Sequence, residues 1–224
     1  RMPEVGGVFL QAESEIAAIQ MVYGASCAGK RAMTSSSSPG ISLKSEGLSY
    51  LAGSDLPALV VNVQRAGPGL GGIQPAQADY FQATRGGGHG DFRNIVLAPA
   101  SAQEMYSLTL RGFDLADRYN MTAMILADGT IGQMMEQVTL TETAPKLVEK
   151  PWALTGTRGE REKHVITSLY LAPEELEEKN LSRFARYKLV EERETDFESY
   201  CMEDAEICLV AYGIAARVSR SAVA

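Results

Sequence analysis

The stretch Ala58-Leu59-Val60-Val61-Asn62-Val63-Gln64 is mostly apolar, which indicates a buried strand. A strand that is apolar on both faces is typical of a parallel sheet covered by helices on both sides. Working outward from it, shorter strands are predicted at 8–11, 31–36, 95–98 and 123–126. We therefore expect these segments to share a sheet in which 58–64 is the clearest strand.

Helices are predicted between these strands. Apolar and alanine residues recur at helical spacing over 13–29, and 41–53 also suits a helix. The helix predicted at 101–119 begins with a capping box, Ser101 followed three residues later by Glu104. Alternating strands and helices to about residue 132 imply an α/β fold with a doubly wound, mostly parallel sheet.

The remaining chain divides by composition. Residues 66–91 are rich in glycine and lack periodicity, which is typical of a segment that serves a site or an interface. Charge rises and prolines recur over 139–205, where we expect a connector with one or two solvated helices after 174. A buried strand at 207–213 and a helix from Ala215 would start another α/β domain. The predicted boundaries are therefore 1–138, 139–205 and 206–224.

Bulk properties exclude several classes of function. The chain has 224 residues, with 21 Lys and Arg against 28 Asp and Glu, a formal charge of −7 that disfavours nucleic acids and anionic lipid surfaces. No apolar run reaches the roughly 18 residues that a membrane helix needs, and no signal-peptide pattern begins the sequence. Cys27, Cys201 and Cys208 lack paired spacing, which indicates free thiols in a reducing cytoplasm. No metal or iron–sulfur site is expected within this chain alone.

Two glycine motifs invite a phosphate-binding interpretation. Residues 24–30 nearly spell a P-loop, but Arg31 replaces the hydroxyl residue that would bind magnesium, and Gly24 falls inside a predicted helix. Residues 67–72 match the dinucleotide fingerprint in spelling, but the following Ile-Gln-Pro cannot propagate the helix that must meet the pyrophosphate. We therefore expect residues 24–30 to belong to a helix and residues 67–72 to form a mobile loop.

Polar residues that follow strands are the better candidates for a site. Glu13 and Glu15 open a helix directly after a predicted strand, although carboxylates in a first helical turn are often simple dipole complements on a solvated face. An apolar setting would instead let a glutamate share a proton with a ring nitrogen. The serines at 35–38, followed by Gly40, are either a flexible turn or a ligand contact, because α/β sheets bind ligands at the carboxyl ends of their strands.

Further motifs lie in a fixed order along the chain. They are Phe9-Leu-Gln-Ala-Glu-Ser-Glu15-Ile-Ala-Ala-Ile-Gln-Met-Val-Tyr-Gly24-Ala, Ala32-Met-Thr-Ser…Ser38-Pro39-Gly40, Val61-Asn-Val-Gln-Arg65-Ala-Gly-Pro68, Gly87-Gly-His-Gly-Asp91 and Ile95-Val-Leu-Ala-Pro99. Together, over about residues 6–135, they resemble the pyrimidine-binding domain in alpha subunits of 2-oxoacid:ferredoxin oxidoreductases. Residues 74–89 and 167–171 look most like the 3-methyl-2-oxobutanoate (2-ketoisovalerate) type.

The resemblance implies a fold, a reaction, and which subunit binds each cofactor. Such enzymes decarboxylate a 2-oxoacid on thiamine diphosphate, pass electrons through 4Fe–4S clusters to ferredoxin, and form an acyl-CoA. It implies that the diphosphate with its Mg²⁺ and the clusters belong to partner subunits: a beta subunit, a gamma subunit and a ferredoxin-like delta subunit.

The resemblance also assigns roles to residues. Glu15, the glutamate nine residues before Gly24, matches the one that hydrogen-bonds the aminopyrimidine and activates the cofactor. Ser37, Pro39 and Gly40 match the turn beside the cofactor. Arg65 matches an arginine that faces the substrate carboxylate, whereas by its position alone it would be a surface arginine at a strand end.

The sequence departs from the pattern of this family at its start, and other functions remain as alternatives. Family members normally begin with about one more βα unit, which includes a Tyr-Pro-Ile-Thr-Pro-Ser loop, so we expect this chain to be part of a longer subunit and inactive alone. The alternatives are a 2-oxoglutarate enzyme, an indolepyruvate-type or self-contained thiamine enzyme, and a non-catalytic α/β scaffold. A self-contained enzyme would need a Gly-Asp-Gly…Asn-Asn motif, but Gly90-Asp91 is followed by Phe92.

Overall fold

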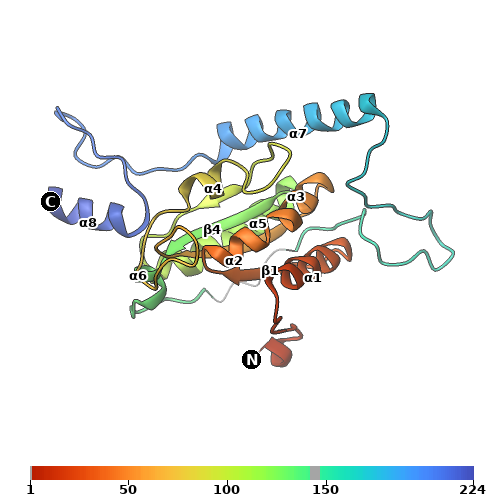
Figure 1. The fold of residues 1–224 in the computed structure, drawn as a ribbon, viewed down its shortest axis with the longest axis horizontal. Coiled ribbons are helices and arrows are strands. Elements are labelled where there is room, and N and C mark those ends of the chain that lie inside the picture. The colour runs from red at the N-terminus through yellow and green to blue at the C-terminus, as the bar shows by residue number, and fades with distance from the viewer. Residues whose placement is uncertain (1, 142–146) are drawn as a thin grey trace.

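The computed structural model describes residues 2–141 and 147–224. Four parallel strands form one sheet in the order β1-β2-β4-β3 (Figure 1). The strands are β1 (Met33–Ser36), β2 (Ala58–Gln64), β3 (Ile95–Leu97) and β4 (Thr122–Asp128). The predicted α/β fold with a parallel sheet is confirmed, and β2 has the predicted bounds. β2 and β4 occupy the centre of the sheet, which explains why their residues are almost all buried.

Helices cover both faces of the sheet, because successive side chains of the central strands point to opposite sides. On one face, α1 (Glu15–Cys27) and α3 (Ser45–Gly53) pack on Ala58, Val60, Met124 and Leu126. On the other, α5 (Ala102–Tyr119) packs on Leu59, Val61, Ala123 and Ile125. Two hydrophobic cores, one on each face, therefore hold the sheet between helices.

The predicted capping box at the start of α5 is present in a shifted form. The Ser101 hydroxyl accepts a hydrogen bond from the backbone N–H of Glu104 at 3.1 Å. The Glu104 carboxylate accepts one from the N–H of Ala100 at 2.7 Å, one residue earlier than the usual partner. These two bonds satisfy N–H groups that the helix itself leaves unpaired.

Short helices connect the main elements near the carboxyl edge of the sheet. They are α2 (Pro39–Leu43), α4 (Tyr80–Thr84) and α6 (Gly129–Gln133), and a 3-10 helix, η1 (Met2–Val5), lies at the N-terminal end. The buried carboxylate of Asp128 caps α6 by accepting from the N–H groups of Thr130 and Ile131 at 2.8 and 3.1 Å. Because β1 and β2 are parallel, the turn after β1 and the loop after β2 leave the sheet at the same carboxyl edge.

The segment after β2 is a loop, as predicted for 67–72, and its base is closed by hydrogen bonds, which was not predicted; its mobility stays a prediction. The N–H of Ala66 donates to the carbonyl of Gln74 at 2.9 Å, and Arg65 forms a bridge with Pro75. Gly71 has a φ of +63°, and a Cβ there would lie 1.8 Å from the carbonyl oxygen of Ala66, so this position requires glycine. Among the described residues, no helix begins between the end of β2 and Tyr80, and Gly24 lies inside α1, so neither glycine motif has the context of a phosphate loop.

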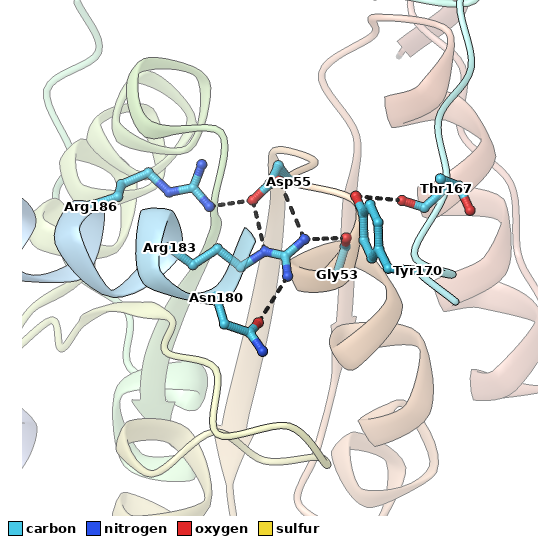
Figure 2. A network of polar contacts seen from close by, with 7 residues as sticks. All are labelled: Gly53, Asp55, Thr167, Tyr170, Asn180, Arg183 and Arg186. Carbon is cyan, nitrogen blue, oxygen red and sulfur yellow. Dashed lines mark hydrogen bonds and ion pairs between the residues drawn. The ribbon is translucent and has the colours of Figure 1, made fainter. Parts of the chain in front are cut away.

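After β4 the chain returns along the domain and continues into the long helix α7 (Pro173–Glu194) (Figure 1). Its predicted solvated character holds for most of its length, but Arg183 and Tyr187 are buried. Figure 2 shows the Arg183 guanidinium between Asn180, the carbonyl of Gly53 at 2.5 Å and the carboxylate of Asp55 at 3.2 Å. Arg186 pairs with the same carboxylate. Asp55 therefore fastens α7 to the turn between α3 and β2.

Two predicted strands are wrong. Residues 8–11 and 207–213 pair with no strand among the described residues. Val8 and Val210 are 85% and 95% exposed, so neither segment is the buried strand that its composition predicted. The helix expected after 215 is present as α8 (Gly213–Val223).

Described residues of the predicted connector contact the sheet domain both before residue 142 and after residue 146. Residues 142–146 of that connector lie outside the described residues. The backbone N–H of Thr139 donates to Gln103 Oε1 in α5 at 2.8 Å, and the N–H of Leu154 donates to the carbonyl of Cys27 at 2.8 Å. Beyond the predicted connector, α8 contacts β4 and α6. Among the described helices, none is long and apolar enough to cross a membrane.

Candidate functional site

Glu15 lies against the turn that follows β1. It is the first residue of α1, and its carboxylate reaches Gly40 at the start of α2. A Cβ at Gly40 would lie 3.0 Å from Glu15 Oε1 and 2.0 Å from Ser36 Oγ. Only a residue without a side chain fits between these two polar groups, so Gly40 brings Glu15 and the end of β1 into one corner.

Ser38 joins this turn to the start of the loop after β2. Its backbone N–H donates to the side-chain oxygen of Asn62 at 3.2 Å, and its hydroxyl donates to Asp79 Oδ2 at 2.7 Å. The same hydroxyl oxygen accepts from the backbone N–H of Arg65 at 3.0 Å. Ser38 has a φ of +22°, an unusual conformation for a residue other than glycine. Several bonds therefore hold a strained residue at the centre of the site.

Two buried amides in β2 complete the network around Asp79. Asn62 Nδ2 donates to Asp79 Oδ2 at 2.9 Å, and Gln64 Oε1 accepts from the backbone N–H of Asp79 at 3.0 Å. Gln64 Nε2 donates to the carbonyl of Ala127 at 3.3 Å in β4. Asn62 and Gln64 are fully buried, so these bonds supply the partners that buried polar groups need.

Arg65 is half-buried directly after β2. One guanidinium nitrogen, Nη2, donates to the carbonyl of Leu70 at 3.2 Å, which ties the side chain to the loop. Its Nε is buried and makes no hydrogen bond within the described residues. A charged donor without a partner is costly in a buried place, so this group suits an anionic ligand.

Lys44 was missed by the sequence analysis. It lies between α2 and α3, and it is 1% exposed. Its Nζ donates to the Thr34 hydroxyl at 2.8 Å and to the Ser35 carbonyl at 3.1 Å, both in β1. Burial lowers the pKa of Lys44 below its ordinary 10.5, and the negative charge of Glu15 acts against that shift.

The structure brings the predicted site residues to one edge of the sheet, the edge where the strands end. Glu15 and Gly40 are in contact, Pro39 is the first residue of α2, and the Ser37 carbonyl accepts from the N–H of Gly40 at 2.8 Å. Arg65 joins them through Ser38. Asn62, Gln64 and Asp79 were also missed, although two amides inside an otherwise apolar strand were a usable signal.

No group of three His, Cys, Asp or Glu side chains is arranged to hold a metal ion among residues 2–141 and 147–224. The side chains that meet at this edge are a half-buried carboxylate, a buried lysine, and a guanidinium with an unused donor.

A family model described as pyruvate flavodoxin/ferredoxin oxidoreductase, thiamine diphosphate-binding, matches residues 2–199. The chain is 56% identical over 222 residues to the ketoisovalerate oxidoreductase subunit VorB of Methanothermobacter marburgensis, covering 99% of this chain and 63% of that subunit. It is 39% identical over 231 residues to the 2-oxoglutarate synthase subunit KorA of Archaeoglobus fulgidus, covering 98% and 64%.

A solved structure shares the fold. The chain matches the 2-oxoglutarate:ferredoxin oxidoreductase from Magnetococcus marinus, solved with 2-oxoglutarate, coenzyme A and succinyl-CoA bound, with a TM-score of 0.74 and 32% identity. The match covers 90% of this chain and 40% of that one. The chain thus spans under two thirds of the length of these relatives.

Proposed function

Because the chain belongs to the pyruvate flavodoxin/ferredoxin oxidoreductase family of thiamine diphosphate-binding domains, we propose that it supplies the pyrimidine half of a thiamine diphosphate site. The parent enzyme would oxidatively decarboxylate a 2-oxoacid to an acyl-CoA and pass the electrons to ferredoxin. The observation that carries this proposal is the corner formed by Glu15, Gly40 and Ser36, into which no side chain at position 40 would fit.

We propose 3-methyl-2-oxobutanoate (2-ketoisovalerate) as the substrate. The VorB subunit of Methanothermobacter marburgensis is 56% identical to this chain and that of Methanothermobacter thermautotrophicus 54%, against 39% for the KorA relative of similar coverage. A second candidate is 2-oxoglutarate, which the KorA name and the Magnetococcus marinus structure support. The two acids differ at the end remote from the reacting carbonyl. 3-Methyl-2-oxobutanoate is apolar there and requires an apolar pocket, whereas 2-oxoglutarate carries a second carboxylate and requires a polar or cationic one.

Glu15 is the residue that would move a proton. Thiamine diphosphate supplies a carbanion-stabilising centre when bound, and its activation needs a proton on the aminopyrimidine ring. Glu15 Oε1 faces the glycine corner, where a ring nitrogen could approach it without meeting a side chain. The carboxylate would hold the shared proton in this position, and Ser37, Pro39 and Gly40 would form the wall beside the ring.

Arg65 would bind the substrate carboxylate. Its Nε has no hydrogen-bond partner among the described residues although it is buried, and the guanidinium fork matches the two oxygens of a carboxylate. Since its backbone is fixed to Ser38, Arg65 would hold the 2-oxoacid at a set distance from the cofactor turn.

The rest of the enzyme would come from partner subunits. We propose that a beta subunit binds the diphosphate with Mg²⁺, and that gamma and ferredoxin-like delta subunits complete the complex and carry 4Fe–4S clusters. Coenzyme A and ferredoxin would be the remaining reactants.

The test is turnover by the complex purified from cells that express this subunit. We expect CoA-dependent reduction of ferredoxin with 3-methyl-2-oxobutanoate at a kcat/KM well above that with 2-oxoglutarate or pyruvate. A preference for 2-oxoglutarate would reject the substrate in favour of the second candidate. A complex that contains the subunit but turns over no 2-oxoacid would reject the enzyme and favour a scaffold role.

A further inference from the structure

Tyr212 directly precedes α8, and it contacts the loop after β2 although 135 residues of sequence separate it from Gln77 in that loop. Its backbone carbonyl accepts a hydrogen bond from Gln77 Nε2 at 2.8 Å. Its ring lies 5.7 Å from the ring of Tyr80, measured between centroids, with the two planes tilted by 32°. The half-buried ring also packs against the hydrophobic core on the α1 face of the sheet. The proposed function has so far given Tyr212 no role.

The two contacts lie on either side of Asp79, because Gln77 precedes it and Tyr80 follows it. The backbone N–H of Asp79 donates to Gln64 Oε1 at 3.0 Å. The Tyr212 hydroxyl lies 3.5 Å from the same oxygen, which is a long contact for a hydrogen bond. Tyr212 therefore holds the chain before Asp79 and after it, and its hydroxyl reaches the side chain that fixes the Asp79 backbone.

The backbone approaches the loop closely at this point. Gly213 is buried with a φ of +57°, and a Cβ there would lie 2.9 Å from Gln77 Nε2, so the position requires glycine. The rest of α8 is fixed elsewhere, since Arg217 pairs with Glu136 at 2.6 Å in the segment after α6. The contact of Tyr212 with the loop is thus separate from the ion pair that anchors α8.

From Asp79 the hydrogen bonds continue to the proposed site. Its Oδ2 accepts from the Ser38 hydroxyl, and the oxygen of that hydroxyl accepts from the N–H of Arg65. We propose that Tyr212 is a positioning residue, which fixes Asp79 and thereby holds the arginine that is proposed to bind the substrate carboxylate. This inference rests on the proposed function, because it concerns how that arginine is held.

Substrate binding should depend on Tyr212 more than cofactor activation does. Glu15 reaches the site from α1 and lies against Gly40, away from the loop after β2. The turn after β1 also keeps the bond from the Ser38 N–H to Asn62, which lies inside β2. Loosening the loop should therefore displace the substrate arginine and leave the proton step at Glu15 as it is.

The first measurement is amide hydrogen exchange over residues 64–80 in the complex that contains this subunit, which does not depend on the proposed reaction. Tyr212→Ala removes the ring and the hydroxyl but keeps the carbonyl that Gln77 bonds. We expect these amides to exchange about 3- to 10-fold faster than in the wild type, as for the loss of one aromatic contact. Tyr212→Phe keeps the ring and should exchange like the wild type. Tyr212→Leu replaces the alanine variant if that variant does not assemble.

The second measurement is kinetic, with whichever of 3-methyl-2-oxobutanoate and 2-oxoglutarate the complex turns over faster. Tyr212→Ala should raise the KM about 3- to 10-fold and leave deuterium exchange at the reactive carbon of the cofactor at the wild-type rate. Added to Arg65→Ala, it should raise the KM no further, because its effect passes through that arginine. Arg217→Met loosens α8 without touching the loop and should leave the KM unchanged.

Three results would overturn the role of Tyr212. They are wild-type amide exchange over 64–80 in Tyr212→Ala, faster amide exchange with an unchanged KM, and an equal rise of the KM in Arg217→Met. Failure of the proposed function is distinguishable from these results. Arg65→Ala would then leave the KM unchanged, whereas failure of the Tyr212 role alone leaves the effect of Arg65→Ala intact.

Discussion

Asp79 accepts a hydrogen bond from the Ser38 hydroxyl at 2.7 Å, across 41 residues of sequence. Asp79 precedes α4 and Ser38 precedes α2, so the bond joins two connections that leave adjacent strands. The Ser38 oxygen also accepts from the N–H of Arg65. One hydroxyl therefore sets the distance between the proposed cofactor turn and the proposed substrate arginine.

Ser38→Ala removes that hydroxyl. It leaves the N–H of Arg65 without its acceptor and Asp79 with one donor fewer, so we expect a loss of about 1–3 kcal/mol in the free energy of unfolding. The KM for the 2-oxoacid should rise because Arg65 is no longer fixed. Denaturant titration and steady-state kinetics measure these effects. Ser107→Ala, on the exposed side of α5, should change stability by less than about 0.5 kcal/mol. Equal stability of both variants would contradict the role of the network.

Glu15→Gln should nearly abolish turnover and leave assembly intact. An amide fills the same space but cannot exchange the proton, and a positioned acid–base group typically contributes about 10²- to 10⁴-fold. Deuterium exchange at the reactive carbon of the bound cofactor measures the loss directly. Glu13→Gln is the matched control, because Glu13 is exposed and precedes α1. A wild-type exchange rate in Glu15→Gln would remove Glu15 from the mechanism.

Arg65→Ala should raise the KM for the 2-oxoacid more than it slows deuterium exchange at the cofactor. The guanidinium is proposed to hold the substrate carboxylate, whereas cofactor activation precedes substrate binding. Arg65→Lys should recover only part of the affinity, since an ammonium cannot form the paired hydrogen bonds of a guanidinium. An unchanged KM in Arg65→Ala would assign the carboxylate to another residue.

Asp55→Asn should loosen α7. Asparagine tolerates the φ of +53° at this position, so the change removes the charge that faces Arg183 and Arg186 while keeping the backbone. A fully buried pair loses about 3–5 kcal/mol when one partner is removed. Because the Asp55 side chain is 32% exposed, we expect about 1–3 kcal/mol. Glu198→Gln, which breaks the exposed pair with Arg220, should have almost no effect on chemical denaturation.

Glu194 should make the stability of the chain depend on acid pH. The Tyr119 hydroxyl bonds its carboxylate at 2.6 Å and Arg118 pairs with it, and both hold the pKa of Glu194 below the ordinary 4.5. A lowered pKa contributes stability that is complete above 4.5 and is lost as the pH falls through the folded-state value. The unfolding temperature of Glu194→Gln should therefore be lower than that of wild type at pH 6, and the difference should shrink at pH 3. A constant difference would exclude this carboxylate as the titrating group.

Local sequence patterns were sufficient to predict the central strand of the sheet. The strand 58–64 was predicted at its observed bounds, because both of its faces are covered and its composition is therefore unambiguous. The segments 8–11 and 207–213 have similar apolar residues, but a strand is stable only beside another strand, and no neighbour is available to them among the described residues. Composition reports the tendency to be buried and not the presence of a partner.

The site was predictable only in part. Arg65 and the Ser37–Gly40 turn follow strands that the sequence reveals, so their placement at one edge follows from the parallel sheet. Glu15 was expected there because of the strand predicted at 8–11, which is wrong; it lies there as the first residue of α1, against Gly40. Lys44 lies in a stretch of serine and glutamate that is typical of a surface. Lys44 joins α2 to α3 and its Nζ reaches Thr34 and Ser35 in β1, so its burial is a property of the tertiary structure.

The closed base of the loop after β2 makes the position of the loop's ends independent of the sequence at its tip. The Ala66–Gln74 hydrogen bond and the Arg65–Pro75 bridge fix the ends of this loop independently of its tip. Doubling the length of a flexible loop costs only about 0.6 kcal/mol once its ends are held together. The Arg65 backbone therefore stays in place when residues of the tip other than Leu70 and Gly71 are exchanged; the Leu70 carbonyl accepts from the Arg65 side chain, and Gly71 requires glycine. The exposed part of the loop can thus vary in sequence while the residues proposed to contact the cofactor keep their places.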